Sequence, residues 1–194
     1  ISIMKIQYSY LKNFLNTNLS QKKLSDVFTQ VGFECEIEGD LIEFDITPNR
    51  GDALSLRGLE REFYAYQSQK TSQKIETSSL KLIQDKKIIN QIDGSGCGNY
   101  HLMLVKGLQK IKNLDSRKRS FIESAGIPLI NPLVDLGNYV MLELGGPLHV
   151  FDLAKLALPI NVLYPQENHN TVTVIGGDVK DVQSSSLLIQ DQSG

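Results

Sequence analysis

The sequence predicts an α+β protein made of two units that are joined by a polar linker. In each half of the chain, apolar residues recur at helical spacing in some segments and alternate with polar residues in others. Between the halves, residues 67–79 carry a single aliphatic side chain and resemble a linker in composition. We therefore expect a small α+β module at residues 1–66, a linker at 67–79 and a second α+β unit at 80–194.

The first helix of the N-terminal module is expected to follow a short strand and one helical turn within residues 4–15. Ser20 is a good N-cap, and Gly32 is suited to the left-handed position that ends a helix. The residues between them form one apolar face at helical spacing, which consists of Leu24, Val27, Phe28 and Val31.

A β-hairpin and a second helix complete the predicted module. Residues 33–37 and 41–46 alternate like strands, and the Gly39-Asp40 pair between them is a turn signal. Residues 47–52 are expected to form a loop whose Asp52 caps the next helix. The inner face of that helix is expected to consist of Leu56, Leu59, Phe63 and Tyr66.

The second unit is expected to combine two helices with short strands. Residues 100–108 alternate like a strand, and a helix capped by Asp115 or Ser116 should run to Ala125 and stop at Gly126. The next helix begins with Asn131 as its cap and Pro132 in the first position, and ends at residues 145–147. Its expected buried stripe is Leu133, Leu136, Val140, Met141 and Leu144. Further strands are expected at residues 160–163, 171–175 and 186–189.

Composition excludes several classes of protein. The 194 residues are 41% hydrophobic with a net charge of −2, which is typical of a globular protein and not of a chain that binds nucleic acid by overall charge. We expect no DNA binding, no membrane association and a location in the cytoplasm. The two cysteines are expected to be buried free thiols, and no spacing of His, Cys or acidic residues suggests a metal site.

One segment departs from this balance, because residues 106–119 hold six basic residues and one acid. Two interpretations stay open. The segment is either a solvated helix face or a contact with RNA phosphates. For the second interpretation, the candidate contacts are Lys110, Lys112, Arg117 and Lys118.

The strongest chemical pattern lies between residues 131 and 152. The turn at 145–147 should reverse the chain and bring His149 back toward the preceding helix, which carries Asn138. An amide, an imidazole and the rigid Pro147 beside an apolar wall could bind an amino-acid ester. The alternative is structural, with Asn138 acting as a cap and His149 as a hydrogen-bonded core residue.

Ordered sequence blocks resemble the β subunit of bacterial phenylalanyl-tRNA synthetase. They are MKIQYSYLKNFL at residues 4–15, ITPNRGDALSLRGLERE at 46–62, CGNY at 97–100, SAGI at 124–127 and LVDLGNYVMLELGGPLHVFDL at 133–153. The last block is long and specific. The resemblance implies a B1-like module followed by part of a B3/B4 editing domain.

This resemblance also implies a function. The family charges tRNA-Phe as an (αβ)2 enzyme, and its B3/B4 region hydrolyses tyrosine that has been attached wrongly. By the resemblance, Asn138, Pro147 and His149 belong to the editing pocket as binding or orienting residues. ATP and Mg²⁺ are expected to act elsewhere in the whole enzyme, and no cofactor is expected in this chain.

The sequence departs from the family pattern at several positions. Gly137 stands where the family has Thr, Gly146 where it has Gln, Val150 where it has Ala and Asn99 where it has Arg. The OB-fold insertion is missing at the hairpin, and the family's editing domain continues beyond the position of residue 194. We therefore expect little editing by this chain alone. A non-catalytic scaffold or a tRNA-binding module remains as an alternative function.

Overall fold

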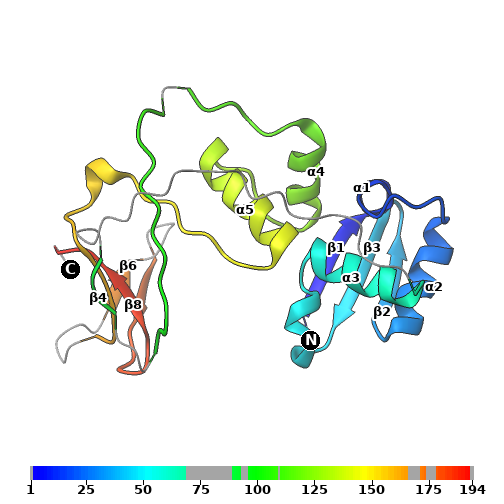
Figure 1. Cartoon of the computed structure of the whole chain (residues 1–194), viewed down its shortest axis with the longest axis horizontal. Coiled ribbons are helices and arrows are strands. Elements are labelled where there is room, and N and C mark those ends of the chain that lie inside the picture. Colours follow the sequence, from blue (N-terminus) through cyan, green and yellow to red (C-terminus); the bar gives the residue numbers. More distant parts are fainter. Residues whose placement is uncertain are drawn as a thin grey trace. The chain divides into compact units, whose positions relative to one another are not determined.

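The computed structural model describes residues 2–68, 89–92, 96–108, 110–165, 171–173 and 178–192. It confirms the predicted α+β class (Figure 1). By their contacts, residues 1–77 and 109–150 form one compact unit, and residues 78–108 and 151–194 form another. This grouping differs from the predicted division at residues 66 and 80, because residues 109–150 group with the N-terminal module. The predicted linker, apart from residues 67 and 68, lies outside the described residues.

The first unit is built on an antiparallel sheet of three strands in the order β1-β3-β2. These strands are β1 (Ser2–Gln7), β2 (Glu34–Glu38) and β3 (Leu41–Ile46). Side chains alternate along β3, so that Ile42, Phe44 and Ile46 are buried while Glu43 and Asp45 are half-exposed. The predicted hairpin is therefore confirmed, with Gly39 in its turn at a φ of +60°.

Helices α1 (Tyr8–Phe14), α2 (Gln21–Val31) and α3 (Leu56–Tyr66) complete this module. The Ser20 hydroxyl accepts a hydrogen bond from the Lys23 amide, and Gly32 adopts a φ of +109°, so both predicted ends of α2 are confirmed. Leu24 and Phe28 are fully buried in the core that α2 shares with α3 and the sheet.

Two predictions about the start and the face of α3 are wrong. Residues 48–53 form a 3-10 helix, and Ser55 caps α3 by accepting a hydrogen bond from the Gly58 amide at 3.0 Å. Asp52 instead accepts hydrogen bonds from Arg50 and Arg61. Tyr66 is 47% exposed. In its place Tyr64 is buried, because its hydroxyl can donate to the Leu15 carbonyl at 2.9 Å.

Helices α4 (Ser116–Ser124) and α5 (Pro132–Leu144) pack on the N-terminal module. The Asp115 carboxylate accepts a hydrogen bond from the Lys118 amide, and Asn131 accepts from the amides of residues 133 and 134, so both predicted caps are confirmed. Phe121 of α4 belongs to the hydrophobic core of the module, and its ring stacks on Tyr10 with 4.5 Å between ring centroids.

The predicted buried stripe of α5 is wrong. Leu136 and Leu144 are 43% and 48% exposed, whereas Asp135 and Gly137 are buried. The helix carries apolar residues around most of its circumference, so its sequence does not identify the face that packs. The contacting face consists of Tyr139 and Leu142, which pack against the core of the module.

The second unit contains two small sheets. One has the order β4-β5-β8, with β4 (Ile89–Ile92) parallel to β5 (Ile160–Leu163) and β8 (Leu188–Gln190) antiparallel to it. The other pairs β6 (Thr171–Thr173) with β7 (Val179–Asp181). The predicted strand at 160–163 is confirmed, and the one at 186–189 is shifted to 188–190. The remainder of the strand predicted at 171–175 lies outside the described residues.

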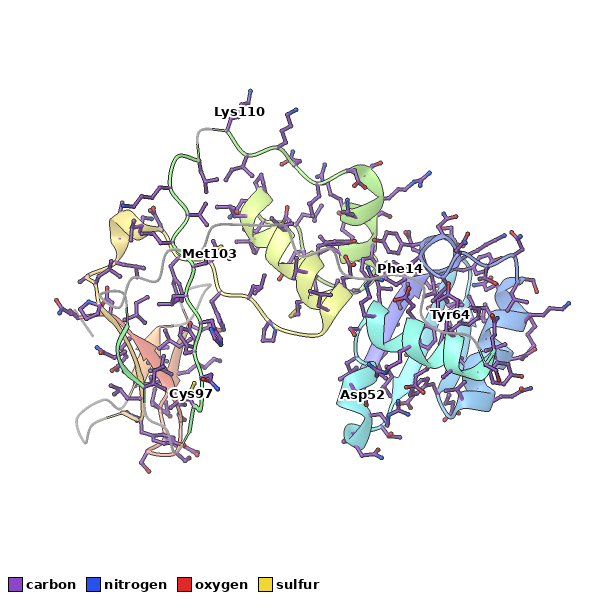
Figure 2. The ribbon with its side chains drawn as sticks, viewed as in Figure 1. Phe14, Asp52, Tyr64, Cys97, Met103 and Lys110 are labelled. Atoms are coloured by element: carbon purple, nitrogen blue, oxygen red, sulfur yellow. The ribbon has the colours of Figure 1, made fainter. Side chains whose placement is uncertain are left out.

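The strand predicted at residues 100–108 is wrong. This segment has no regular secondary structure, and Met103, Val105 and Leu108 are exposed. A strand needs a neighbour that satisfies its backbone groups, and within the described ranges no strand pairs with this segment. Figure 2 shows Met103 on this stretch and Cys97 on the chain before it.

Both cysteines are free thiols, as predicted. They are partly buried, whereas full burial was expected. Burial raises the pKa of the Cys35 thiol to about 11. Within the described residues, no helix has the length and apolar character that a membrane span requires. The same residues contain no group of three or more His, Cys, Asp or Glu side chains placed to hold a metal ion.

The solvent face of the first sheet contains a like-charge pair that predicts a stability change. Glu34 lies directly opposite Asp45, and one oxygen of that Asp45 carboxylate is buried without a hydrogen-bond partner. Glu34→Lys should raise the free energy of unfolding by about 0.5 kcal/mol at low salt, because it replaces repulsion with attraction across the strands. Urea unfolding at low salt and at high salt measures this effect, which should shrink in the second condition.

The control is Glu38→Lys, because Glu38 lies opposite the uncharged Leu41. This variant makes the same charge change but loses the attraction between Glu38 and Lys5, so it should give no gain in stability. An equal gain from both variants would show a general effect of net charge and would contradict the pairwise explanation.

Candidate functional site

The candidate site is built on helix α5 and on the segment that follows it. The Asp135 carboxylate accepts a hydrogen bond from the Ile130 amide at 2.8 Å, which fixes the entry of the chain into the helix. Gly145 ends the helix in a left-handed conformation with a φ of +87°. A side chain at this position would be strained and would lie 3.4 Å from the Ser55 side chain of the N-terminal module.

Beyond the turn at residues 145–147, the chain returns along α5 as predicted. A Cβ atom placed on Gly137 would lie 3.8 Å from the Cβ atom of Leu148 and 4.0 Å from a methyl group of Val150. Residues 148–150 therefore lie against the middle of the helix. The contact brings the backbone of His149 close to the helix turn that carries Asn138.

The three predicted pocket residues differ in exposure. Asn138 is half-buried, whereas Pro147 and His149 are exposed. Two cavities in the described parts of the chain, with volumes of about 760 and 210 Å³, are lined by other residues. The role of Asn138, Pro147 and His149 in a pocket stays a prediction.

An ion pair ties the site to the N-terminal module. Arg57 of α3 donates to Glu143 of α5 at 3.0 Å and to Glu60 at 2.9 Å, and Glu60 is buried. Glu60 belongs to α3, as Arg57 does, whereas Glu143 lies in the last turn of α5. Arg57 therefore bridges the two helices. Sequence reasoning missed this bridge, because the pairing of residues 86 positions apart carries no local signal.

Tyr139, next to Asn138, faces the core and not the candidate site. Its hydroxyl lies 3.2 Å from that of Tyr10, and the ammonium group of Lys118 lies 5.5 Å from its ring centroid. Burial, together with the hydrogen bond to Tyr10, raises the pKa of the Tyr139 hydroxyl. The group is therefore neutral near pH 7 and serves to anchor the helix.

The four candidate tRNA contacts have different surroundings. Lys110 and Lys112 are exposed on the irregular segment before α4, and Figure 2 shows the Lys110 side chain projecting from the ribbon. Lys118 forms an ion pair with Asp115 at 2.7 Å, and the hydrogen bond that its ammonium group donates to this carboxylate raises the pKa of Lys118. Arg117 is exposed, and it makes no ion pair or hydrogen bond with its side chain among the described residues.

Three further polar residues do not contribute to the candidate site as described. Asp152 caps the 3-10 helix Leu153–Lys155 by accepting from the Ala154 amide at 3.0 Å. His101 is exposed on an irregular segment and not in a strand. His169 lies outside the described residues.

Comparison with known proteins identifies the family. The B3/4 domain matches residues 96–194, which is just over half of the chain. The chain belongs to the B3/4 domain family. This match contains α4, α5 and the candidate site, and it begins inside the second predicted unit at 80–194.

Curated relatives extend the similarity into the N-terminal module. The phenylalanine--tRNA ligase β subunit of Haemophilus influenzae is 34% identical over 158 residues, which cover 81% of this chain and 20% of that protein. The same subunit of Rhodopirellula baltica is 30% identical over 199 residues, with 98% of this chain and 29% of that protein covered. The predicted resemblance is confirmed. The chain spans between a fifth and three tenths of the length of these relatives.

A solved structure is also similar. An N-terminal fragment of the phenylalanyl-tRNA synthetase β subunit from Pyrococcus horikoshii superimposes with a TM-score of 0.43 and 17% sequence identity. The superposition covers 93% of this chain and 50% of that one.

Proposed function

We propose that this chain is the region of a phenylalanine--tRNA ligase β subunit that contributes to the removal of tyrosine from mischarged tRNA. The relatives carry this name, and the B3/4 match covers the candidate site. A pocket for phenylalanine cannot strongly reject a side chain that merely adds a hydroxyl, so a second, hydrolytic site adds the missing specificity.

The return of residues 148–150 along α5 at Gly137 is the observation that supports this proposal most directly. It brings the backbone of His149 close to the helix turn that carries Asn138. In this proposal, Asn138 donates to and accepts from the tyrosyl group, while His149 orients the ester or the attacking water. Pro147 holds the turn between them. None of the three residues acts as a nucleophile.

The proposed setting is the cytoplasmic (αβ)2 synthetase, with tRNA-Phe as the second partner. Lys110, Lys112 and Arg117 would contact tRNA phosphates, and Lys118 would contribute less because Asp115 already neutralises it. ATP and Mg²⁺ would serve the aminoacylation reaction at residues outside this chain.

Deacylation of Tyr-tRNA by the complete parent enzyme tests the proposed roles. His149→Ala and Asn138→Ala should each lower the rate of hydrolysis by about 10- to 100-fold, because each removes a positioning group. His101→Ala and Asn18→Ala are matched controls, since both residues are exposed and neither is a predicted pocket residue. Normal deacylation by both site variants would remove Asn138 and His149 from the reaction.

A non-catalytic scaffold for the α subunit is the second candidate function. It is favoured by the exposure of Pro147 and His149 and by glycine at position 137, where the family has a hydroxyl-bearing residue. A parent enzyme that hydrolyses Tyr-tRNA well above the background rate would exclude this alternative. A rate equal to the background would support it.

A further inference from the structure

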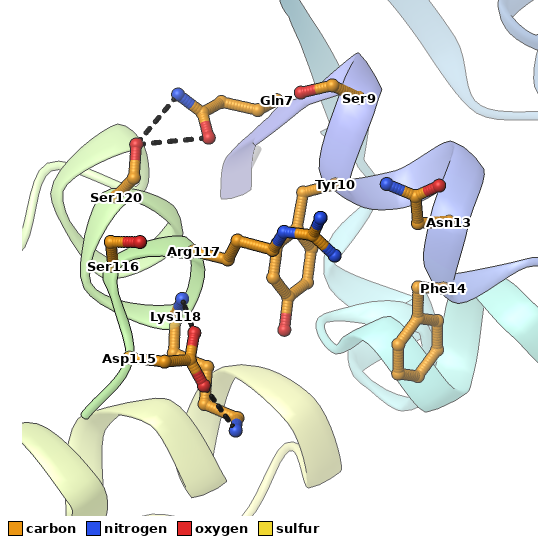
Figure 3. A pocket seen from close by; sticks show the side chains of 10 residues that line it. All are labelled: Gln7, Ser9, Tyr10, Asn13, Phe14, Asp115, Ser116, Arg117, Lys118 and Ser120. Atoms are coloured by element: carbon orange, nitrogen blue, oxygen red, sulfur yellow. Dashed lines mark hydrogen bonds and ion pairs between the residues drawn. The ribbon is translucent and has the colours of Figure 1, made fainter.

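A cavity of about 760 Å³ lies within the first unit (Figure 3). One wall is formed by α1 and the last residue of β1, and the other by the first turns of α4. The candidate editing site does not include this cavity, although Arg117 and Lys118 in its lining are among the candidate tRNA contacts. Its volume lies within the range of small-molecule sites, which is roughly 300 to 1,000 Å³. The side chains that line it are mostly polar and include one guanidinium group.

Three of the polar side chains that line the cavity are available to a ligand. Asn13, Ser116 and Arg117 make no side-chain hydrogen bond or ion pair among the described residues. Gln7 and Ser120, in contrast, are hydrogen-bonded to each other at 3.0 Å. Figure 3 shows the Arg117 side chain reaching from α4 toward α1, where Asn13 lies.

Among the charged side chains that line the cavity, Arg117 is the one without an ion-pair partner in the described residues. Lys118 and Asp115 form an ion pair with 2.7 Å between the ammonium nitrogen and a carboxylate oxygen, and so neutralise each other. The same Asp115 carboxylate already accepts the Lys118 amide at the start of α4, so the helix N-terminus is occupied by its own cap. An anion entering the cavity would therefore bind the guanidinium side chain. A guanidinium presents a fork of donors that matches the oxygens of a phosphate.

Aromatic rings make up another part of the wall and keep it rigid. Tyr10 stacks on the buried Phe121 with an interplanar angle of 7°, and its hydroxyl lies 3.2 Å from that of Tyr139. The ring of Phe14 also lines the cavity and is fixed by Arg57, whose guanidinium carbon lies 4.9 Å from its centroid. Such rings offer apolar contact to a sugar or a base, while Asn13 and Ser116 offer hydrogen bonds.

We propose that this cavity binds a ribonucleotide, with Arg117 on its phosphate and with Asn13 and Ser116 bonded to its sugar or base. The nucleotide comes either from the free pool or from a tRNA. The proposal does not depend on the editing site, so a chain that fails to deacylate Tyr-tRNA still permits the test.

Titration of the 194-residue chain with AMP, followed by calorimetry at low salt, tests the proposal. Arg117→Ala should weaken AMP binding at least tenfold, and Asn13→Ala should weaken it severalfold. Arg119→Ala is the matched control, because it removes the same charge from the same helix but does not line the cavity. It should change the affinity less than twofold. Circular dichroism of each variant should match that of the unaltered chain.

A second arm distinguishes the two sources of the nucleotide. Tight binding of deacylated tRNA that AMP displaces, and that Arg117→Ala weakens, would assign the cavity to a nucleotide of the tRNA. Binding of AMP that excess tRNA does not displace would assign it to a free nucleotide. The proposal is overturned if neither AMP nor tRNA binds, or if Arg119→Ala weakens binding as much as Arg117→Ala, since the latter result would show a diffuse effect of surface charge.

Discussion

Replacement of Gly58 by alanine is expected to lower the free energy of unfolding by about 3 kcal/mol or more. A Cβ atom on Gly58 would lie 2.2 Å from the carbonyl oxygen of Asp52 and 2.7 Å from the Cα atom of Ala53. Both neighbours are backbone atoms of the preceding 3-10 helix, so they cannot rotate away as a side chain could. Alanine is better than glycine inside a helix by about 1 kcal/mol, and that gain is too small to offset the clash.

Gly137→Ala makes the same chemical change in the interior of α5 and serves as the control. Its Cβ atom would have Leu148 and Val150 as neighbours at ordinary contact distances of 3.8 to 4.0 Å. This variant should therefore gain about 0.4 to 1 kcal/mol, mainly through the lower entropy of the unfolded chain. Urea unfolding of both variants measures the difference. A Gly58→Ala chain as stable as the unaltered one would contradict the close approach of α3 to residues 52 and 53.

The sequence was sufficient to predict the elements whose signals are local. The ends of α2 follow from Ser20 and Gly32, and the start of α5 follows from Asn131 and Pro132, because a cap acts on amides within three residues of itself. The hairpin around Gly39 was predictable for the same reason. In each of these cases, the residues that specify the conformation are those that adopt it.

Features that depend on distant partners could not be predicted in this way. The alternating pattern of residues 100–108 is compatible with a strand, but a strand forms only where another strand can pair with it. Apolar residues surround most of α5, so the pattern could not show that Tyr139 and Leu142 form the packed face. Likewise, the cavity is lined by Gln7 and Ser120, which are hydrogen-bonded to each other although they lie 113 positions apart in the sequence.

The candidate site shows both situations at once. The turn at residues 145–147 is a local signal, and the predicted return of the chain toward α5 occurs at Gly137. The roles of Asn138, Pro147 and His149 came from the family resemblance. Their exposure depends on what packs around them, which no residue within the turn can specify.

Phe121→Ala is expected to destabilise the first unit by about 3 to 5 kcal/mol, which is the usual cost of removing a fully buried phenylalanine. Phe121 is completely inaccessible, stacks on Tyr10 and contacts the ring of Tyr139 edge-on with 6.4 Å between centroids. Phe121→Leu keeps most of the apolar volume and should cost only about 1 kcal/mol. Denaturant unfolding of both variants measures the values.

A double-mutant cycle with Tyr10 tests whether this packing joins α4 to the N-terminal module. Since aromatic pairs contribute about 0.5 to 1.5 kcal/mol beyond the burial of their area, the losses in Phe121→Ala and Tyr10→Ala should fail to add by that amount. Losses that add to within about 0.3 kcal/mol would contradict the stacking of the two rings. Coupling of the expected size would place residues 116–124 in the core of the N-terminal module, although they lie within the B3/4 match. The domain family and the folding unit would then have different boundaries in this chain.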